Sequence, residues 1–183
     1  IRMFGQMWGT PNLETTDPFC AAGKNITYQM THGANGCGNS YTNDDIGSAG
    51  MYLYIGDNQA ETRPVYFGMV NDWRVTNGAK MVVVDPRYSA TASKADRWHS
   101  IRPGTDMALG LAMSQHIFAQ GLHDQRYCEN WIEGWEKWRD FLNEQGYTPD
   151  WAMCITDIAA DYIKRLAEDV AKADGCVIFC SRG

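Results

Sequence analysis

The sequence predicts an α/β fold, with an open, mostly parallel, Rossmann-like sheet and helices on both of its faces. Apolar runs of strand length alternate with helix-like stretches from residue 51 onward, and such alternation is typical of α/β sheets. The first two runs and the helix-like stretch between them fit within about 35 residues, the size of a parallel strand–helix–strand unit. In an open sheet of this kind, ligands bind at the carboxyl ends of the strands.

The first strand–helix–strand unit can be followed residue by residue. The short apolar run Met51–Ile55 is the expected first strand. Pro64 suits the first position of a helix, and the helix-like stretch Val65–Val75 reaches a stop signal at Gly78. The apolar run Met81–Val84 is then the expected second strand.

Further elements follow towards the end of the chain. We expect one helix over Asp106–Ala119, which stops at Gly121, and a long helix over Ile155–Lys172. Cys176–Cys180 is an apolar run that predicts another strand. Three tryptophans at i, i+4 and i+7 spacing predict a packing face on one further helix: Trp131, Trp135 and Trp138.

Composition excludes several classes of function. The 183 residues are 44% hydrophobic, which is typical of a globular protein. The formal net charge is −6 and Lys and Arg are not clustered, which argues against nucleic acid as a ligand. No apolar stretch approaches the roughly 18 residues of a membrane-spanning helix. Because the chain begins without a start methionine and ends soon after an apolar run, we expect it to be an internal piece of a longer protein.

Six cysteines are present, but none forms a Cys-x-x-Cys pair of the kind that binds zinc or an iron–sulfur cluster. We therefore expect no cluster held by this segment alone. Cys176 and Cys180 share one face of their expected strand, which favours core packing over metal binding. Four cysteines are interpreted as structural: Cys128, Cys154, Cys176 and Cys180.

Two polar loops follow the first two expected strands. Residues 56–58, Gly-Asp-Asn, leave the first strand, and residues 85–87, Asp-Pro-Arg, leave the second. A glycine-containing turn at a helix N-terminus suits a pyrophosphate, and an acid at the end of the next strand suits ribose hydroxyls. Because the chain has no Gly-x-Gly-x-x-Gly motif, a nicotinamide or flavin dinucleotide in the usual mode is disfavoured.

Structural interpretations of the same residues stay open. Asp106 can cap the helix that follows it, Asp85 can begin a turn before proline, and Arg102 can be a solvated surface charge. For either aspartate taken alone, the structural interpretation is the simpler one.

Three segments carry a family resemblance. They read Gly-Asp-Asn-Gln-Ala-Glu-Thr-Arg-Pro at 56–64, Val-Val-Val-Asp-Pro-Arg-Tyr-Ser-Ala-Thr-Ala-Ser-Lys-Ala-Asp-Arg-Trp at 82–98, and Ile-Arg-Pro-Gly-Thr-Asp-Met-Ala-Leu at 101–109. In this order and spacing they resemble the molybdopterin oxidoreductases of the dimethyl sulfoxide reductase family. The resemblance extends from about Gly9 to the end of the chain and includes Thr-Pro-Asp-Trp-Ala at 148–152.

The resemblance implies a cofactor, a bis-molybdopterin guanine dinucleotide that holds molybdenum or tungsten. Eight residues of the three loops would hold one of the two dinucleotides: Gly56, Asn58 and Glu61, then Asp85 and Arg87 at the nucleoside, then Gly104, Thr105 and Asp106 at the guanine. The chemistry agrees, because one carboxylate can accept hydrogen bonds from both guanine N1–H and the exocyclic amine.

Cys20 aligns with the position where this family places the side chain that ligates the metal. We therefore interpret Cys20 as a metal ligand and as the catalytic residue. Thiolate is a soft ligand, and the start of a helix-like stretch with Lys24 nearby favours the thiolate form. Without the resemblance, a small buried thiol is the better interpretation. Cysteine in place of serine resembles the polysulfide, thiosulfate, arsenate and periplasmic nitrate branches, and Cys37 is the nearest rival ligand.

The resemblance also implies an organisation. Residues 1–50 would carry the metal-ligand loop and a helix segment that leads into the sheet, and residues 51–183 would form the dinucleotide-binding domain of a larger multidomain enzyme. A 4Fe–4S cluster would lie in the part preceding Ile1. The implied reaction is two-electron oxygen-atom transfer, or a related reduction of a small inorganic or organic acceptor.

The partners implied are a small-molecule substrate, an iron–sulfur electron-transfer subunit and a membrane anchor subunit. The implied location is periplasmic or membrane-associated through partners, in a bacterium or archaeon, as in anaerobic respiration. The alternative is a non-catalytic structural or electron-transfer subunit that retains the fold without the metal cofactor, as occurs in respiratory complex I.

Overall fold

The computed structural model describes residues 2–12, 22–33 and 42–181. These belong to two compact units, divided between Tyr41 and Thr42. The described residues of the first unit form the helices α1 (Arg2–Trp8) and α3 (Ala22–His32). None of the described helices combines the length and the apolar character that a membrane crossing requires.

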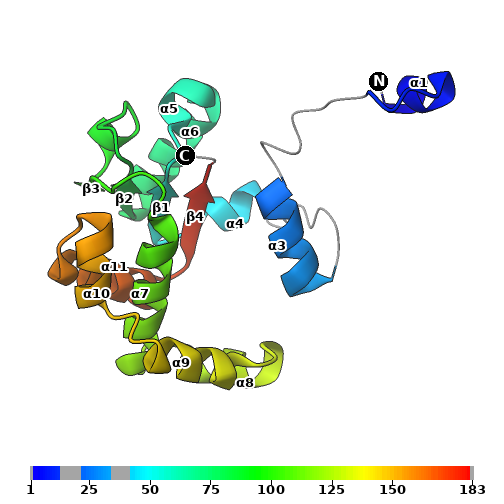
Figure 1. Ribbon diagram of the computed structural model, residues 1–183. Helices are drawn as coiled ribbons and strands as arrows, with labels where there is room; N and C mark the ends of the chain where they lie inside the picture. Colours follow the sequence, from blue (N-terminus) through cyan, green and yellow to red (C-terminus); the bar gives the residue numbers. More distant parts are fainter. Residues whose placement is uncertain (1, 13–21, 34–41, 182–183) are drawn as a thin grey trace. The chain divides into compact units, whose positions relative to one another are not determined.

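The second unit is built on a sheet of four parallel strands, shown in Figure 1. Their bounds are β1 (Met51–Ile55), β2 (Lys80–Val84), β3 (Arg97–His99) and β4 (Cys176–Cys180). The strand order is β3-β2-β1-β4. This confirms the expected α/β class and the three strands expected from apolar runs. The strand β3 was not predicted, because three residues are too few to show an alternating pattern.

Helices precede the first strand and connect the strands: α4 (Asn43–Gly47), α5 (Gln59–Thr62), α6 (Pro64–Asn77), the 3-10 helix η1 (Ala92–Lys94), α7 (Asp106–Ala119), α8 (Gln125–Trp131), α9 (Trp135–Glu144), α10 (Pro149–Thr156) and α11 (Ala160–Lys172). Pro64 begins α6 and Gly78 ends it in the left-handed conformation with φ of 65°. Both helix signals in the sequence therefore act as predicted.

Two apolar clusters cover the two faces of the sheet. On one face, side chains such as Leu53 and Val84 pack with residues of α7, α10 and α11. On the other face, Tyr52 and Tyr54 pack with Phe67 and other residues of α6 and its neighbours. Successive strand residues point to opposite faces, so a fully apolar strand is buried on both sides. This confirms that the sheet has helices on both faces.

The helix expected over 155–172 is wrong at its start. The structure has two helices there, because α10 ends at Thr156 and α11 begins at Ala160. Asp157 between them is left-handed, with φ of 64°. Its carboxylate binds Arg102, whose backbone N–H donates to the Thr156 carbonyl at 2.9 Å. The break between α10 and α11 is therefore stabilised by Arg102, which is 55 residues from Asp157. No local sequence pattern predicts such a break.

Asp169 joins α11 to two strands. Its carboxylate accepts a hydrogen bond from Lys80 Nζ at 3.0 Å and pairs with Arg97. Burial raises the pKa of this carboxyl, but the hydrogen bonds from Lys80 and Arg97 outweigh burial and leave it below 3.8. Because the folded-state pKa is depressed, the stabilisation is complete above the unfolded-state pKa and is lost as pH falls through the folded-state value.

We expect Asp169→Asn to lower the free energy of unfolding by about 1–2 kcal/mol at pH 7, since two partly exposed ion pairs are lost. The deficit should shrink as the pH falls below 3.8, where wild type also loses its charge. Urea unfolding at neutral and acid pH measures both values. An equal deficit at the two pH values would assign the effect to packing.

Candidate cofactor-binding site

Three loops leave the carboxyl ends of β1, β2 and β3, which are neighbours in the sheet. They are residues 56–58, 85–91 and 100–105. Because the strands are parallel, these loops open on one edge, where α/β sheets bind ligands. The paired last residues of the strands, such as Ile55 beside Val84, bring the first two loops together.

The loop after β1 is tied to the loop after β2. Gly56 turns the chain with φ of 57°, a conformation that favours glycine, and its N–H donates to the Val84 carbonyl. The side-chain oxygen of Asn58 accepts from the Thr91 N–H at 3.3 Å and from the Thr91 hydroxyl at 2.9 Å. Asn58 thus holds two loops together, and its contact with a cofactor stays a prediction.

A second contact between these two regions is looser. Arg87 Nη2 lies 3.5 Å from Glu61 Oε2, and both side chains are more than half exposed. Asp85 accepts a hydrogen bond from the Arg87 N–H at 2.8 Å, which is the turn described by the structural alternative. The structure brings Glu61, Asp85 and Arg87 together, and their side chains remain open to solvent or only partly buried.

The third loop leads into α7. Gly104 has φ of 80°, and the Thr105 hydroxyl donates to the Arg102 carbonyl at 2.6 Å. Arg102 is not a free surface charge, because Nε and Nη2 donate to the two oxygens of Asp157 at 2.9 and 2.6 Å. This bidentate pair fixes the loop before α7 against the break between α10 and α11.

Asp106 is the first residue of α7, and Thr105 is the residue at the N-cap position. The Asp106 side chain is exposed and accepts no hydrogen bond from residues 2–12, 22–33 or 42–181. The helix-capping alternative for Asp106 therefore has no hydrogen bond to support it in the described part of the chain. Its carboxylate is available to a ligand with paired donors.

Cys180 ends β4 and is paired with Ile55, the last residue of β1. Neighbouring protein atoms partly desolvate the Cys180 thiol and raise its pKa, and the carboxylates of Asp57 and Asp106 raise it further. Cys180 itself is exposed, so the expected core packing is confirmed only for Cys176, which packs against one apolar cluster. Of the other two cysteines interpreted as structural, Cys128 is buried and Cys154 is exposed.

His99, the last residue of β3, also lies at this end of the sheet. Its ring lies 5.2 Å from that of Tyr162, and its Nε2 is buried without a hydrogen-bond partner in the described segments. Burial lowers the pKa of His99, and Arg97 and Arg165 lower it further. The imidazole is thus neutral at pH 7 and supplies no fixed positive charge for a phosphate.

Sequence reasoning missed two buried polar residues of this site, Asp57 and Thr91. They are 2% and 0% exposed and are hydrogen-bonded to neighbouring loop residues. Asp57 stands inside the Gly-Asp-Asn motif and could have been noticed there. Thr91 carries no local signal, because its role depends on a partner 33 residues away.

Cys20, the predicted metal ligand, and Cys37, its nearest rival, lie outside the described residues. The helix expected after Cys20 is α3, which begins at Ala22. Among the residues that the structure does describe, no group of three or more His, Cys, Asp or Glu side chains is placed to hold a metal ion.

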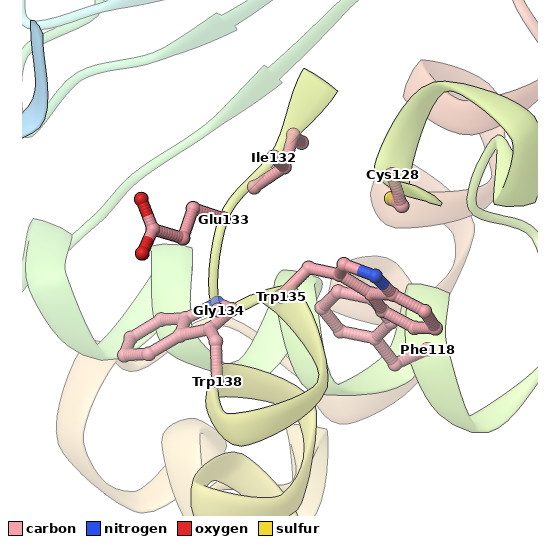
Figure 2. Close-up of a pocket in the computed structure, with 7 residues that line it drawn as sticks. All are labelled: Phe118, Cys128, Ile132, Glu133, Gly134, Trp135 and Trp138. Atoms are coloured by element: carbon pink, nitrogen blue, oxygen red, sulfur yellow. The ribbon is translucent and has the colours of Figure 1, made fainter. Parts of the chain in front are cut away.

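A separate pocket of about 400 Å³ lies at α8 and α9 and contains none of the predicted site residues (Figure 2). It is lined by Phe118, Cys128, Ile132, Glu133, Gly134, Trp135 and Trp138. The expected tryptophan face on one helix is wrong, since Trp131 ends α8 and Trp135 begins α9. Gly134, with φ of 78°, turns the chain between them, and Trp131 is 78% exposed.

Comparison with known proteins gives the family. The family model described as molybdopterin oxidoreductase matches residues 3–173. The molybdopterin-containing subunit of thiosulfate reductase from Salmonella typhimurium is 35% identical over 164 residues, which cover 90% of this chain and 21% of the relative. A putative formate dehydrogenase from Staphylococcus aureus is 31% identical over 180 residues, covering 97% of this chain and 18% of the relative.

A solved structure agrees with this. Acetylene hydratase from Pelobacter acetylenicus has a TM-score of 0.80 and 29% identity, over 97% of this chain and 23% of that chain. The chain thus spans about a fifth of the length of these relatives. The match to the family model covers nearly the whole chain. The three loops of this chain open at the carboxyl edge of the sheet, as predicted. The chain belongs to the molybdopterin oxidoreductase family.

Proposed function

We propose that residues 51–183 bind one molybdopterin guanine dinucleotide of a bis-dinucleotide cofactor that holds molybdenum or tungsten, and that Cys20 ligates the metal. The complete enzyme would carry out two-electron oxygen-atom transfer or a related reduction of a small acceptor. When bound, the cofactor supplies the change of oxidation state, while the protein positions the cofactor and the substrate.

The exposed carboxylate of Asp106 is the main support for the proposal. Its carboxylate stands exposed at the carboxyl edge and accepts no hydrogen bond from the described residues. Guanine presents N1–H and the exocyclic amine side by side, so one carboxylate can accept from both. Adenine lacks this pair of donors, and such a contact would select guanine.

The charges of the first two loops also fit a dinucleotide. The guanidinium side chains of Arg63 and Arg87 are 52% and 68% exposed. Arg63 pairs with Asp57, and Arg87 pairs with Glu61. Exposed guanidinium groups suit the oxygens of a diphosphate. The acid at the end of β2, Asp85, keeps one oxygen outside its turn and can accept from a ribose hydroxyl.

The substrate is not set by the family. The three similar proteins are named as a thiosulfate reductase subunit, a putative formate dehydrogenase and an acetylene hydratase, which differ in substrate. We propose a small inorganic or organic acceptor, an iron–sulfur electron-transfer subunit as partner, and a 4Fe–4S cluster in the full-length protein. A membrane anchor subunit and a periplasmic or membrane-associated location belong to the same proposal.

Metal and nucleotide analysis of the full-length protein tests this function. We expect molybdenum or tungsten, and about two GMP released per chain on acid hydrolysis, since each dinucleotide carries one guanosine. Elemental analysis and chromatography of the released nucleotide give both values. Protein with neither metal nor GMP would instead support the non-catalytic subunit that keeps only the fold.

A further inference from the structure

The loop after β1 contains a buried carboxylate, Asp57. Contact with a cofactor does not account for its burial. Asp57 is 2% exposed, although a buried charge is costly unless it is paired and hydrogen-bonded. Its Oδ2 accepts from Arg63 Nη2 at 2.6 Å and from Gln59 Nε2 at 3.2 Å. Asp57 is therefore turned towards the protein, with its charge balanced by Arg63.

The contacts of Asp57 continue into the core. Gln59, which is 0% exposed, accepts from the Tyr54 hydroxyl at 3.1 Å. Burial raises the pKa of Tyr54, and the negative charge of Asp57 raises it further, so this hydroxyl stays a proton donor. Four side chains form a connected path from β1 to the start of α6: Tyr54, Gln59, Asp57 and Arg63.

The same loop is held from its other side by Thr91. The Thr91 hydroxyl accepts from the Ala60 N–H at 2.9 Å and donates to Asn58 at 2.9 Å. The segment that carries Asn58 and Glu61 thus lies between two buried anchors, Asp57 and Thr91. A binding loop with few conformations to lose binds its ligand more tightly.

We infer that Asp57, through its ion pair with Arg63 and its hydrogen bond from Gln59, is a positioning residue that holds the loop after β1 ready for the dinucleotide. The inference rests on the proposed function. It concerns the order of the loop before binding, because the Asp57 carboxylate faces Arg63 and Gln59 rather than solvent. Its negative charge would repel a phosphate if Arg63 did not balance it.

The test uses full-length protein prepared with and without cofactor. Asp57→Asn keeps the size of the side chain but removes the charge that Arg63 requires. In cofactor-free protein we expect amides of residues 57–63 to exchange hydrogen about tenfold faster, with α11 unchanged. In protein made with cofactor, GMP per folded chain should fall below about half of the wild-type value.

Asp169→Asn is the matched control, because Asp169 also pairs with two basic side chains but lies away from the loops. It should leave the exchange of residues 57–63 and the GMP content unchanged. Arg63→Lys, which keeps a cation, should stay near wild type, whereas Arg63→Gln should resemble Asp57→Asn.

Unchanged exchange of residues 57–63 in Asp57→Asn would overturn the inference. So would faster exchange throughout the sheet unit, matched by Asp169→Asn, since that result assigns Asp57 to general stability. Wild-type protein that contains no GMP would overturn the proposed function instead. The exchange of cofactor-free protein would still decide whether Asp57 orders the loop.

Discussion

Cys20→Ala is expected to lower turnover of the full-length enzyme by a factor of about 100 or more, because the metal loses its protein ligand. Folding and GMP content should change little, since the substitution removes only a thiol from one short side chain. Steady-state kinetics at a measured metal content gives the first value. X-ray absorption at the metal edge should show one sulfur ligand fewer.

Cys20→Ser is the sharper variant, because the family resemblance implies serine at this position in the dimethyl sulfoxide reductases themselves. It should keep the metal, lose the protein sulfur signal and change which oxyanion or chalcogen acceptor is reduced. Cys154→Ala is the matched control, since Cys154 is an exposed thiol in α10, a helix outside the three loops. Full activity and an unaltered spectrum in Cys20→Ser would return Cys20 to the structural thiols and make Cys37 the next candidate.

Asp106→Ala is expected to weaken cofactor binding by about 2–4 kcal/mol, because two guanine donors lose a charged acceptor. Asp106→Asn should weaken it nearly as much, since an amide offers one acceptor where two are needed. GMP content of the purified full-length variants measures the loss. The free energy of unfolding should change by less than about 1 kcal/mol, the size of an interaction with the helix dipole.

Asp161→Asn is the control for the loss of a negative charge at the N-terminus of a helix. Asp161 is also an exposed acid in the first turn of a helix, α11, but it lies outside the three loops. It should leave GMP content unchanged. If Asp106→Asn also kept its full GMP content, the carboxylate would have no role in recognising guanine, and the third loop would be structural.

Local patterns were sufficient for the elements that local forces specify. β1 and β2 are apolar runs buried on both faces, and α6 has a proline at its start and a glycine at its end. From these the sequence predicts parallel strands, and parallel strands bring the loops at 56–58 and 85–87 to one edge. The resemblance to a family, carried by whole motifs, supplied the proposed cofactor and the proposed roles of the eight loop residues.

The sequence by itself determined β1, β2, β4, α6 and α7 and the identity of the loop motifs, because these depend on neighbours in the chain. Only the tertiary structure decided the break at Asp157, which depends on Arg102, and the link between Asn58 and Thr91. It also decided that Asp57 is buried and that Asp106 is exposed. The environment of a carboxylate depends on side chains distant in sequence. Asp57 and Asp106 are both aspartates of loop motifs, yet they differ in exposure and in partners.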